Sequence, residues 1–487
     1  PTTILARLSQ RFKLLRSSRR DTNNRQATLK ATLDWSWGLL DPSEKATMVQ
    51  CASFQGTFSL EAAEAVVDLS MFPEDPWVID LLESLVDKSL LRLTLDARSS
   101  EERYVMFLSV HDYALARLHD SKAVASPAEA PISGPEGARA VRHRHLQFFT
   151  PYGSWDFLKR ISQDRRALDE LGREHNNLTA AFRFAIEQRQ PDDAMLCGLA
   201  ICGIVEHRGP YSTGLDTIEA ILELHPPDNI LKARLLHAQG TLARSAGQPD
   251  RAMAAYRLGL QIAQALGAAR IEGLILYGMG SVQRELGQRD QAQEHYTQSL
   301  QIAQTLGDRV LEGHALYGLA FIQRDQGQAE QALETFQACQ QLAHATHHRL
   351  LEGSALQGLG WVQSDLGRLN QARTSYHACQ QLAHDIGHKL LEGSVLCGLG
   401  YVLKDQGQAQ EALDTFEACR QLARDIGHKR LEATTLDGLG SVSSSLGQWS
   451  QAADRYHDCI HLTRTIGLKS LECYALIGLG FVFEAQG

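Results

Sequence analysis

The stretch that decides the fold is LEGSALQGLGWVQSDLGRLNQARTSYHACQQLAHDIGHKL, residues 351–390. Apolar and small residues recur in it at helical spacing until Gly367, where the pattern breaks, and a second helical run follows to about His384. The stretch therefore predicts a hairpin of two helices joined by a tight turn.

The same hairpin returns every 40 residues along the second half of the chain. Segments that match its first ten residues begin at positions 271, 311, 391, 431 and 471, and an earlier copy starts near Ile230. A period of this length is typical of helical solenoids, because one hairpin cannot bury its apolar face alone and must pack on its neighbours. We expect a mainly α-helical protein in which residues 230–487 form a solenoid with an incomplete last repeat.

Small and aromatic residues hold fixed places in each unit, as Gly360, Gly367, Ala372 and Tyr376 do here. This pattern resembles the tetratricopeptide repeat (TPR) family. The resemblance implies a right-handed superhelix of TPR hairpins that binds a partner along its concave face. Each glycine in a helix interior costs about 1 kcal/mol relative to alanine, so we expect close approaches between helices there.

The positions that the resemblance places on the concave face differ between repeats, and many are aromatic or basic. The candidate partner-binding residues are Tyr277, Arg284, Tyr317, Phe321, Arg324, Trp361, Tyr401, Lys404 and Phe481. Aromatic and arginine side chains supply much of the binding energy at interfaces. The pattern favours a protein or peptide partner or a small inducer; the alternative is that single rings pack against the adjacent helix.

The pattern of residues 26–120 predicts four helices, two short strands near 90–95 and 103–108, and a last helix. This order of elements predicts a winged-helix domain. DPSE, residues 41–44, has the signature of a helix start. RQATLKATLDWSWGLLDPSEK, residues 25–45, and LVDKSLL, residues 85–91, resemble the winged-helix domain of bacterial STAND signal-transduction ATPases, the superfamily of NB-ARC and MalT-like regulators. In that superfamily this domain follows the nucleotide-binding core and precedes a TPR array.

One triplet in this domain bears on nucleotide binding. Val110, His111 and Asp112 resemble the Met-His-Asp triplet of NB-ARC proteins, in which the histidine contacts the β-phosphate of bound ADP. The resemblance implies that His111 and Asp112 contact nucleotide. The alternative is a His–Asp pair that caps a helix.

The chain contains no GxxxxGK[ST] phosphate loop. We therefore expect no enzymatic activity, no catalytic residue, no metal site and no cofactor in this chain. Because the chain starts at Pro1 without an initiator methionine, we expect a longer parent protein. The resemblance implies that an upstream NTPase domain in the same parent binds ADP or ATP, and that residues 1–25 end the helical subdomain that joins it to the winged helix.

The remaining segments predict a linker and a cap. Residues 121–139 are rich in Ala, Pro, Ser and Gly, which indicates a flexible linker. Residues 140–229 resume helical periodicity and end in a degenerate hairpin that would cap the solenoid. EHNNLTAAF, residues 174–182, also resembles the STAND regulators.

Composition narrows the classes of partner and the compartment. A net charge of −9 and an acidic recognition segment near residues 76–89 argue against direct binding of nucleic acid. No apolar run is long enough for a membrane span. Nine cysteines without a CxxC pair favour a reducing cytoplasm.

These features together predict the sensor half of a STAND-type switch, with oligomerisation possible on activation. A stand-alone TPR adaptor and the ligand-sensing part of a transcriptional regulator are the alternatives.

Overall fold

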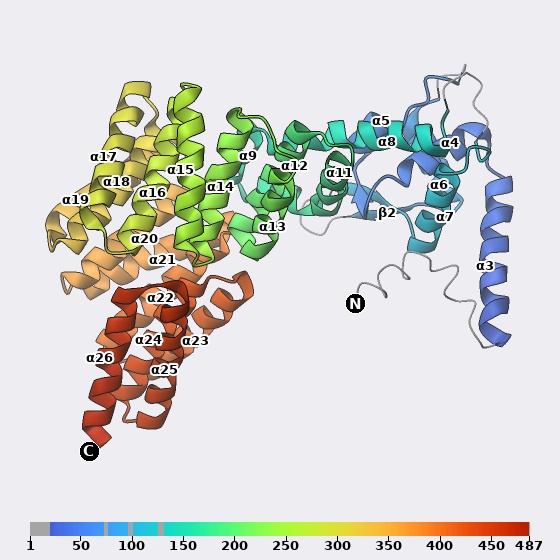
Figure 1. Cartoon of the computed structure of the whole chain (residues 1–487). Coiled ribbons are helices and arrows are strands. Elements are labelled where there is room, and N and C mark those ends of the chain that lie inside the picture. The colour runs from blue at the N-terminus through green and yellow to red at the C-terminus, as the bar shows by residue number, and fades with distance from the viewer. Residues whose placement is uncertain (1–19, 73–75, 96–100, 125–130, 487) are drawn as a thin grey trace. The chain divides into compact units, whose positions relative to one another are not determined.

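The computed structural model describes residues 20–72, 76–95, 101–124 and 131–486. They form two compact units, one up to Phe149 and one from Thr150 onward. Most of the described chain is helical, and the predicted mainly α fold with a solenoid of hairpins is confirmed (Figure 1). Among the described residues, no helix is both long and apolar enough to span a bilayer.

The first unit contains six helices and three short strands within its described residues. They are α3 (Arg20–Gly38), α4 (Pro42–Cys51), β1 (Thr57–Phe58), α5 (Leu60–Val66), α6 (Val78–Asp87), β2 (Arg92–Leu95), β3 (Glu102–Val105), α7 (Leu108–Leu118) and α8 (Gly134–Phe149). The strands form an antiparallel sheet in the order β1-β3-β2, in which Val105 lies opposite both Thr57 and Arg92.

Local signals explain several of these boundaries. Asp41 caps α4 by accepting a hydrogen bond from the Glu44 amide at 2.8 Å, and the Glu44 carboxylate accepts one from the Asp41 amide at 2.9 Å. The two expected strands occur as β2 and β3. The two-residue β1 carries too short a pattern to be seen in the sequence. The winged-helix assignment stays a prediction.

Two expected boundaries differ from the structure. Helix α3 runs through the expected boundary at residue 25, and residues 1–19 of the expected subdomain end lie outside the described residues. Helix α8 begins at Gly134, inside the range 121–139 that we expected to be a linker. Pro135 falls in the first turn of α8, where a helix tolerates proline because that amide has no partner within the helix. The proline that contributed to the expectation of a linker therefore lies at the start of a helix.

The second unit is entirely helical in its described residues. Its helices are the 3-10 turn η1 (Thr150–Gly153), α9 (Trp155–Ile161), α10 (Arg165–Arg173), α11 (His175–Glu187), α12 (Pro191–Arg208), α13 (Tyr211–Leu222), α14 (Ile230–Ser245), α15 (Pro249–Ala265), α16 (Ala269–Glu285), α17 (Arg289–Leu306), α18 (Arg309–Asp325), α19 (Ala329–Ala345), α20 (Arg349–Asp365), α21 (Leu369–Ile386), α22 (Lys389–Asp405), α23 (Ala409–Ile426), α24 (Lys429–Ser445), α25 (Trp449–Ile466) and α26 (Lys469–Gln486). From α12 onward, consecutive helices pair into hairpins that stack in sequence order.

The recurring glycines let the helices approach each other around an aromatic ring. A Cβ added at Gly360 would lie 2.6 Å from the Tyr376 ring, and one at Gly398 would lie 2.5 Å from the same ring. The Tyr376 ring of the second helix thus sits between glycines of the two flanking first helices. The same arrangement surrounds Tyr296 (Gly280 and Gly318), Phe416 (Gly400 and Gly438) and Tyr456 (Gly440 and Gly478). The expected close approach is confirmed.

The cysteines that recur at the repeat period occupy a small packing position. Cys339, Cys379, Cys419 and Cys459 are buried free thiols. The thiol of Cys379 donates to the main-chain oxygen of Gly353 at 2.9 Å, and the other three make the equivalent contact. These thiols join the two helices of a hairpin.

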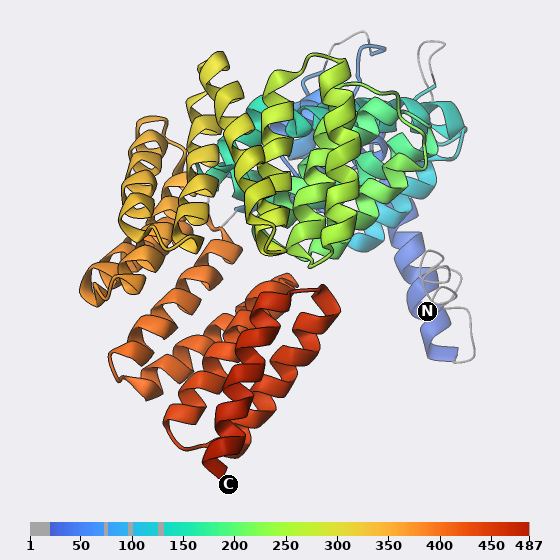
Figure 2. The ribbon, with the colours of Figure 1, turned by 60° about the vertical axis from the view of Figure 1, so that its left-hand side comes forward.

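The solenoid coils back on itself. Helices α24 and α25 lie below α14 and α16 in both views (Figures 1 and 2), although four units separate them in sequence. The main-chain oxygen of Ser162, just after α9, accepts a hydrogen bond from the Leu350 amide at 3.2 Å. The rings of His207 on α12 and His388 before α22 are 4.8 Å apart. The inner face of the solenoid is therefore enclosed by helices distant in sequence.

Candidate functional site

A ladder of ion pairs runs along the inner ends of the first helices. The base near the end of one first helix pairs with an acid in the next repeat. This acid lies one position beyond the residue that is equivalent to the base. The pairs are Arg244–Glu285 at 2.9 Å, Arg284–Asp325 at 3.7 Å and Arg324–Asp365 at 2.5 Å. The ladder stops at α20, where Ser364 occupies the position of the base. Asp405 of the next repeat lies 3.7 Å from Lys404 of its own helix instead. The predicted partner-binding residues Arg284 and Arg324 thus already have carboxylate partners.

The same bases cover the predicted aromatic residues. The guanidinium of Arg284 lies 4.5 Å from the ring centre of Phe321, and that of Arg324 lies 5.3 Å from the ring centre of Trp361. The ammonium of Lys404 lies 5.7 Å from the Tyr401 ring centre, on its own helix. These are cation–π contacts, so bases and rings form one continuous surface.

The rings also pack inward, to different depths. Phe321 is only 8% exposed and meets Phe336 edge-on at 5.0 Å. Trp361 and Tyr401 meet the aromatic rings of their own second helices and stay half-buried. The packing alternative therefore describes Phe321 best.

The other predicted residues divide into two groups. Tyr277 and Tyr317 are half-buried on the same face, on α16 and α18. Phe481 lies apart on α26 and is 64% exposed. Whether any of these residues binds a partner stays a prediction.

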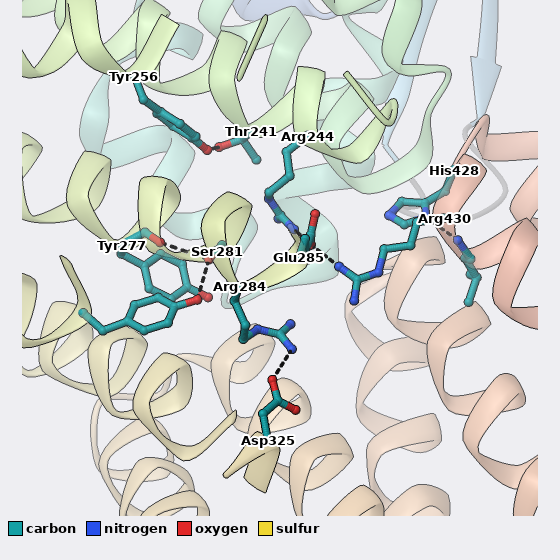
Figure 3. A network of polar contacts seen from close by, with 12 residues as sticks. Thr241, Arg244, Tyr256, Tyr277, Ser281, Arg284, Glu285, Asp325, His428 and Arg430 are labelled. Atoms are coloured by element: carbon teal, nitrogen blue, oxygen red, sulfur yellow. Dashed lines mark hydrogen bonds and ion pairs between the residues drawn. The ribbon is translucent and has the colours of Figure 1, made fainter. Parts of the chain in front are cut away.

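A buried carboxylate joins the two layers of the coil. Glu285 at the end of α16 lies 2.9 Å from Arg244 on α14 and 2.5 Å from Arg430 on α24 (Figure 3). Burial disfavours the charge, but Arg430 and Arg244 outweigh it and hold the pKa of Glu285 below its ordinary value. We call Arg244, Glu285 and Arg430 the clasp.

Three histidines, His348, His388 and His428, cap first helices. Each precedes a first helix, and its Nδ1 accepts a hydrogen bond from the amide three residues on, at 3.2, 3.2 and 3.0 Å. Burial lowers the pKa of His348 and of His428 to about 4. All three act as neutral N-caps.

A cavity of about 240 Å³ lies on the inner face. Its walls come from α9, α12, α14, α16 and α18, with His348 at one end. The polar residues in the walls include Glu206, Arg234, His237, Arg270 and His314.

Sequence reasoning missed these residues. Arg234, Leu274 and His314 share one repeat position, and its variation was a usable signal, like the variation at the positions that we did select. Helix α9 lies outside the repeats, so no periodic signal identified its contribution to the cavity.

The nucleotide-contact candidates lie in the first unit. His111 and Asp112 are in the first turn of α7, and Nε2 of His111 donates to the main-chain oxygen of Phe54 at 3.0 Å. Nδ1 of His111 is 3.9 Å from the Asp112 carboxylate. Helix α7 starts after Phe107 without a side-chain cap, so the pair does not cap it. Contact with nucleotide stays a prediction.

Comparison with known proteins supports the repeat assignment. The sequence model of the tetratricopeptide repeat family matches residues 272–342, 311–379 and 391–464. These residues are TPR repeats, as predicted.

Similar proteins include regulators and other helical arrays. Putative HTH-type transcriptional regulators of Mycobacterium bovis and Mycobacterium tuberculosis are 30% identical over 226 residues, which cover 46% of this chain and 23% of each relative. The chain thus spans less than a quarter of these relatives. A STAND protein with a tetratricopeptide repeat sensor from Pyrococcus horikoshii has 14% identity and a TM-score of 0.45, over 93% of this chain and 61% of that one. A Rap protein complexed with competence and sporulation factor has 12% identity and a TM-score of 0.45, over 65% and 98%.

Proposed function

We propose that this chain is the sensor part of a STAND-type signal-transduction NTPase. The solenoid binds an activating protein, peptide or small inducer, and the first unit, as a winged-helix relay, passes the change to an ADP/ATP switch in the parent protein. The resemblance of residues 25–45 and 174–182 to STAND regulators supports this proposal. We propose no catalytic role for the chain itself.

The observation that carries the proposal is the clasp. A ligand shifts a conformational equilibrium only if it binds one state more tightly than the other. Glu285 is held between arginines from helices five units apart, so the closed coil is one definable state. A ligand that binds at the inner face and alters this contact would therefore favour a second state of the coil, different from the closed one.

The test compares nucleotide retention in the full-length parent with and without the clasp. In Glu285→Gln the coil loses a buried charge between two arginines, and we expect less ADP to remain bound after purification. The matched control is Glu312→Gln, which removes a carboxylate 3.1 Å from the exposed Arg309. Lower stability of Glu285→Gln with unchanged ADP content would favour the stand-alone adaptor.

A role for His111 is proposed separately. Its Nε2 donates to Phe54, so a phosphate oxygen would have to accept from a protonated Nδ1 next to Asp112. We expect His111→Ala to lower the ADP content of the parent, while His119→Ala at the C-cap of the same helix leaves it unchanged. Equal ADP content in both variants would remove His111 from the mechanism.

The second candidate function is the ligand-sensing part of a transcriptional regulator. The description of the mycobacterial relatives as putative HTH-type regulators favours it. In that case the clasp would act on DNA binding by a domain elsewhere in the parent. Glu285→Gln would then change operator affinity without changing nucleotide content.

A further inference from the structure

The cavity on the inner face holds a half-buried cation without an acidic partner. Arg234 on α14 donates to the main-chain oxygen of Gly153 at 3.0 Å, and its guanidinium lies 5.2 Å from the Trp155 ring centre. It forms no ion pair with any described residue. Burial lowers the pKa of Arg234 to about 10, because no carboxylate compensates for the lost water.

The second arginine beside Trp155 is already neutralised. Arg270 on α16 lies 4.6 Å from the same ring centre, and its Nε lies 2.7 Å from the Asp308 carboxylate. The indole Nε1 of Trp155 is buried and donates to no acceptor among the described residues. This end of the cavity therefore offers unused donors and the uncompensated positive charge of Arg234, and the exposed Lys159 also lines the cavity.

The opposite end carries a carboxylate. Glu206 on α12 lines the cavity, and its side chain is exposed to solvent. Arg244 and Arg234 are ten residues apart on α14, which corresponds to about 15 Å along a helix. Arg244 is the cation whose charge acts on Glu206, so Glu206 lies away from the Arg234 end.

The walls between the two ends are mainly apolar and uncharged. They include Leu199, Cys202, Leu274 and Leu311. Burial lowers the pKa of His314 to about 3, so this wall imidazole is neutral near pH 7. A cavity of about 240 Å³ lies below the roughly 300–1,000 Å³ of sites for drug-sized ligands. The space suits a small molecule better than a folded peptide segment.

We propose that this cavity binds a small monoanionic organic acid, whose carboxylate pairs with Arg234 and whose apolar body fills the space toward Glu206. The inference rests on the proposed sensor function, for which it specifies the ligand class. A carboxylate supplies the counter-charge that Arg234 lacks and an acceptor for Trp155. A second negative charge at the far end would meet Glu206.

The experiment measures binding of defined probes to the 487-residue chain by isothermal titration calorimetry. Hexanoate and octanoate are compared with the matched alcohols 1-hexanol and 1-octanol, and octanedioate tests the second charge. We expect the carboxylates to bind at least tenfold more tightly than the alcohols, and octanedioate to bind more weakly than octanoate. Equal affinity of acid and alcohol, tighter binding of octanedioate, or no binding at all would overturn the proposal.

Two variants locate the site. Arg234→Gln should lower octanoate affinity at least tenfold, whereas Arg257→Gln, at an exposed arginine on α15, should not change it. If Arg234→Gln fails to fold, Ala238→Leu fills the cavity instead and should abolish binding, with the exposed Ala254→Leu as its control. Unchanged octanoate affinity in a folded cavity variant would place the binding elsewhere and contradict the proposal.

Failure here is distinguishable from failure of the sensor function. If the carboxylates do not bind but Glu285→Gln changes nucleotide content in the parent, only the ligand class is wrong. If octanoate binds through Arg234 but the nucleotide content of the parent does not change, the sensor function is wrong and the proposed binding site is correct.

Discussion

At the scale of single residues, the stacking of the repeats depends on glycines that face aromatic rings. Tyr376 lies between Gly360 of its own hairpin and Gly398 of the next. The sequence was sufficient to predict this close approach, because both residue types recur in register and a helical glycine otherwise only costs stability. The sequence did not show which ring meets which glycine.

Gly360→Ala should destabilise the chain by about 1–3 kcal/mol, because the added methyl group overpacks against Tyr376. The control is Gly480→Ala at the equivalent position of α26, where an added Cβ meets nothing within 4 Å. That change should be neutral or stabilise by up to about 1 kcal/mol. Urea unfolding measures both; equal effects of the two variants would refute this account of the glycines.

The depth of each predicted binding residue could not be read from the sequence. Phe321 and Trp361 share one repeat position, yet Phe321 is buried and Trp361 is half-buried. Their exposure depends on ring size and on neighbours in other repeats, such as Arg284 over Phe321. Periodicity identifies the face, whereas packing across repeats decides what remains open.

At the scale of elements, the histidines at the helix junctions show why boundaries are hard to predict. Gly387 adopts a left-handed conformation with φ of 69° and ends α21. His388 therefore falls at the start of α22, where its ring accepts from the Leu391 amide. The sequence shows a histidine at each of these junctions but not which of the two helices it caps.

These caps predict a dependence of stability on pH. In the folded chain the pKa of His348 and of His428 is about 4, against 6.5 for a free histidine. The unfolded chain therefore binds more protons between these values, and stability is lost as the pH falls from about 6.5 toward 4. Each histidine contributes at most about 1.4 kcal/mol per pH unit.

The triple variant His348→Asn, His388→Asn and His428→Asn keeps a capping side chain at each position but removes the titrating group. Its urea midpoint should fall less between pH 7 and pH 5 than that of the unchanged chain. The exposed His461→Asn serves as the control. A triple variant with the original pH dependence would show that these caps do not titrate as described.

At the scale of the whole molecule, the repeat pattern predicted the stack of hairpins but not the contacts that close it. Glu285 and Arg430 are more than a hundred residues apart, and their meeting depends on the curvature accumulated over four repeats. Small rotations per repeat set that curvature, and no single residue encodes them. The enclosed cavity was missed for the same reason, since α9 and α12 belong to no regular repeat.

The most direct test of the closed coil is a double-mutant cycle between Glu285→Gln and Arg430→Gln, read as free energies of unfolding. Because the two side chains meet across the coil, we predict a coupling energy of at least about 1 kcal/mol. Glu285→Gln combined with Arg349→Gln, whose arginine pairs with Asp385 instead, should be additive within about 0.5 kcal/mol. An equally additive Glu285–Arg430 pair would contradict a solenoid that closes on itself.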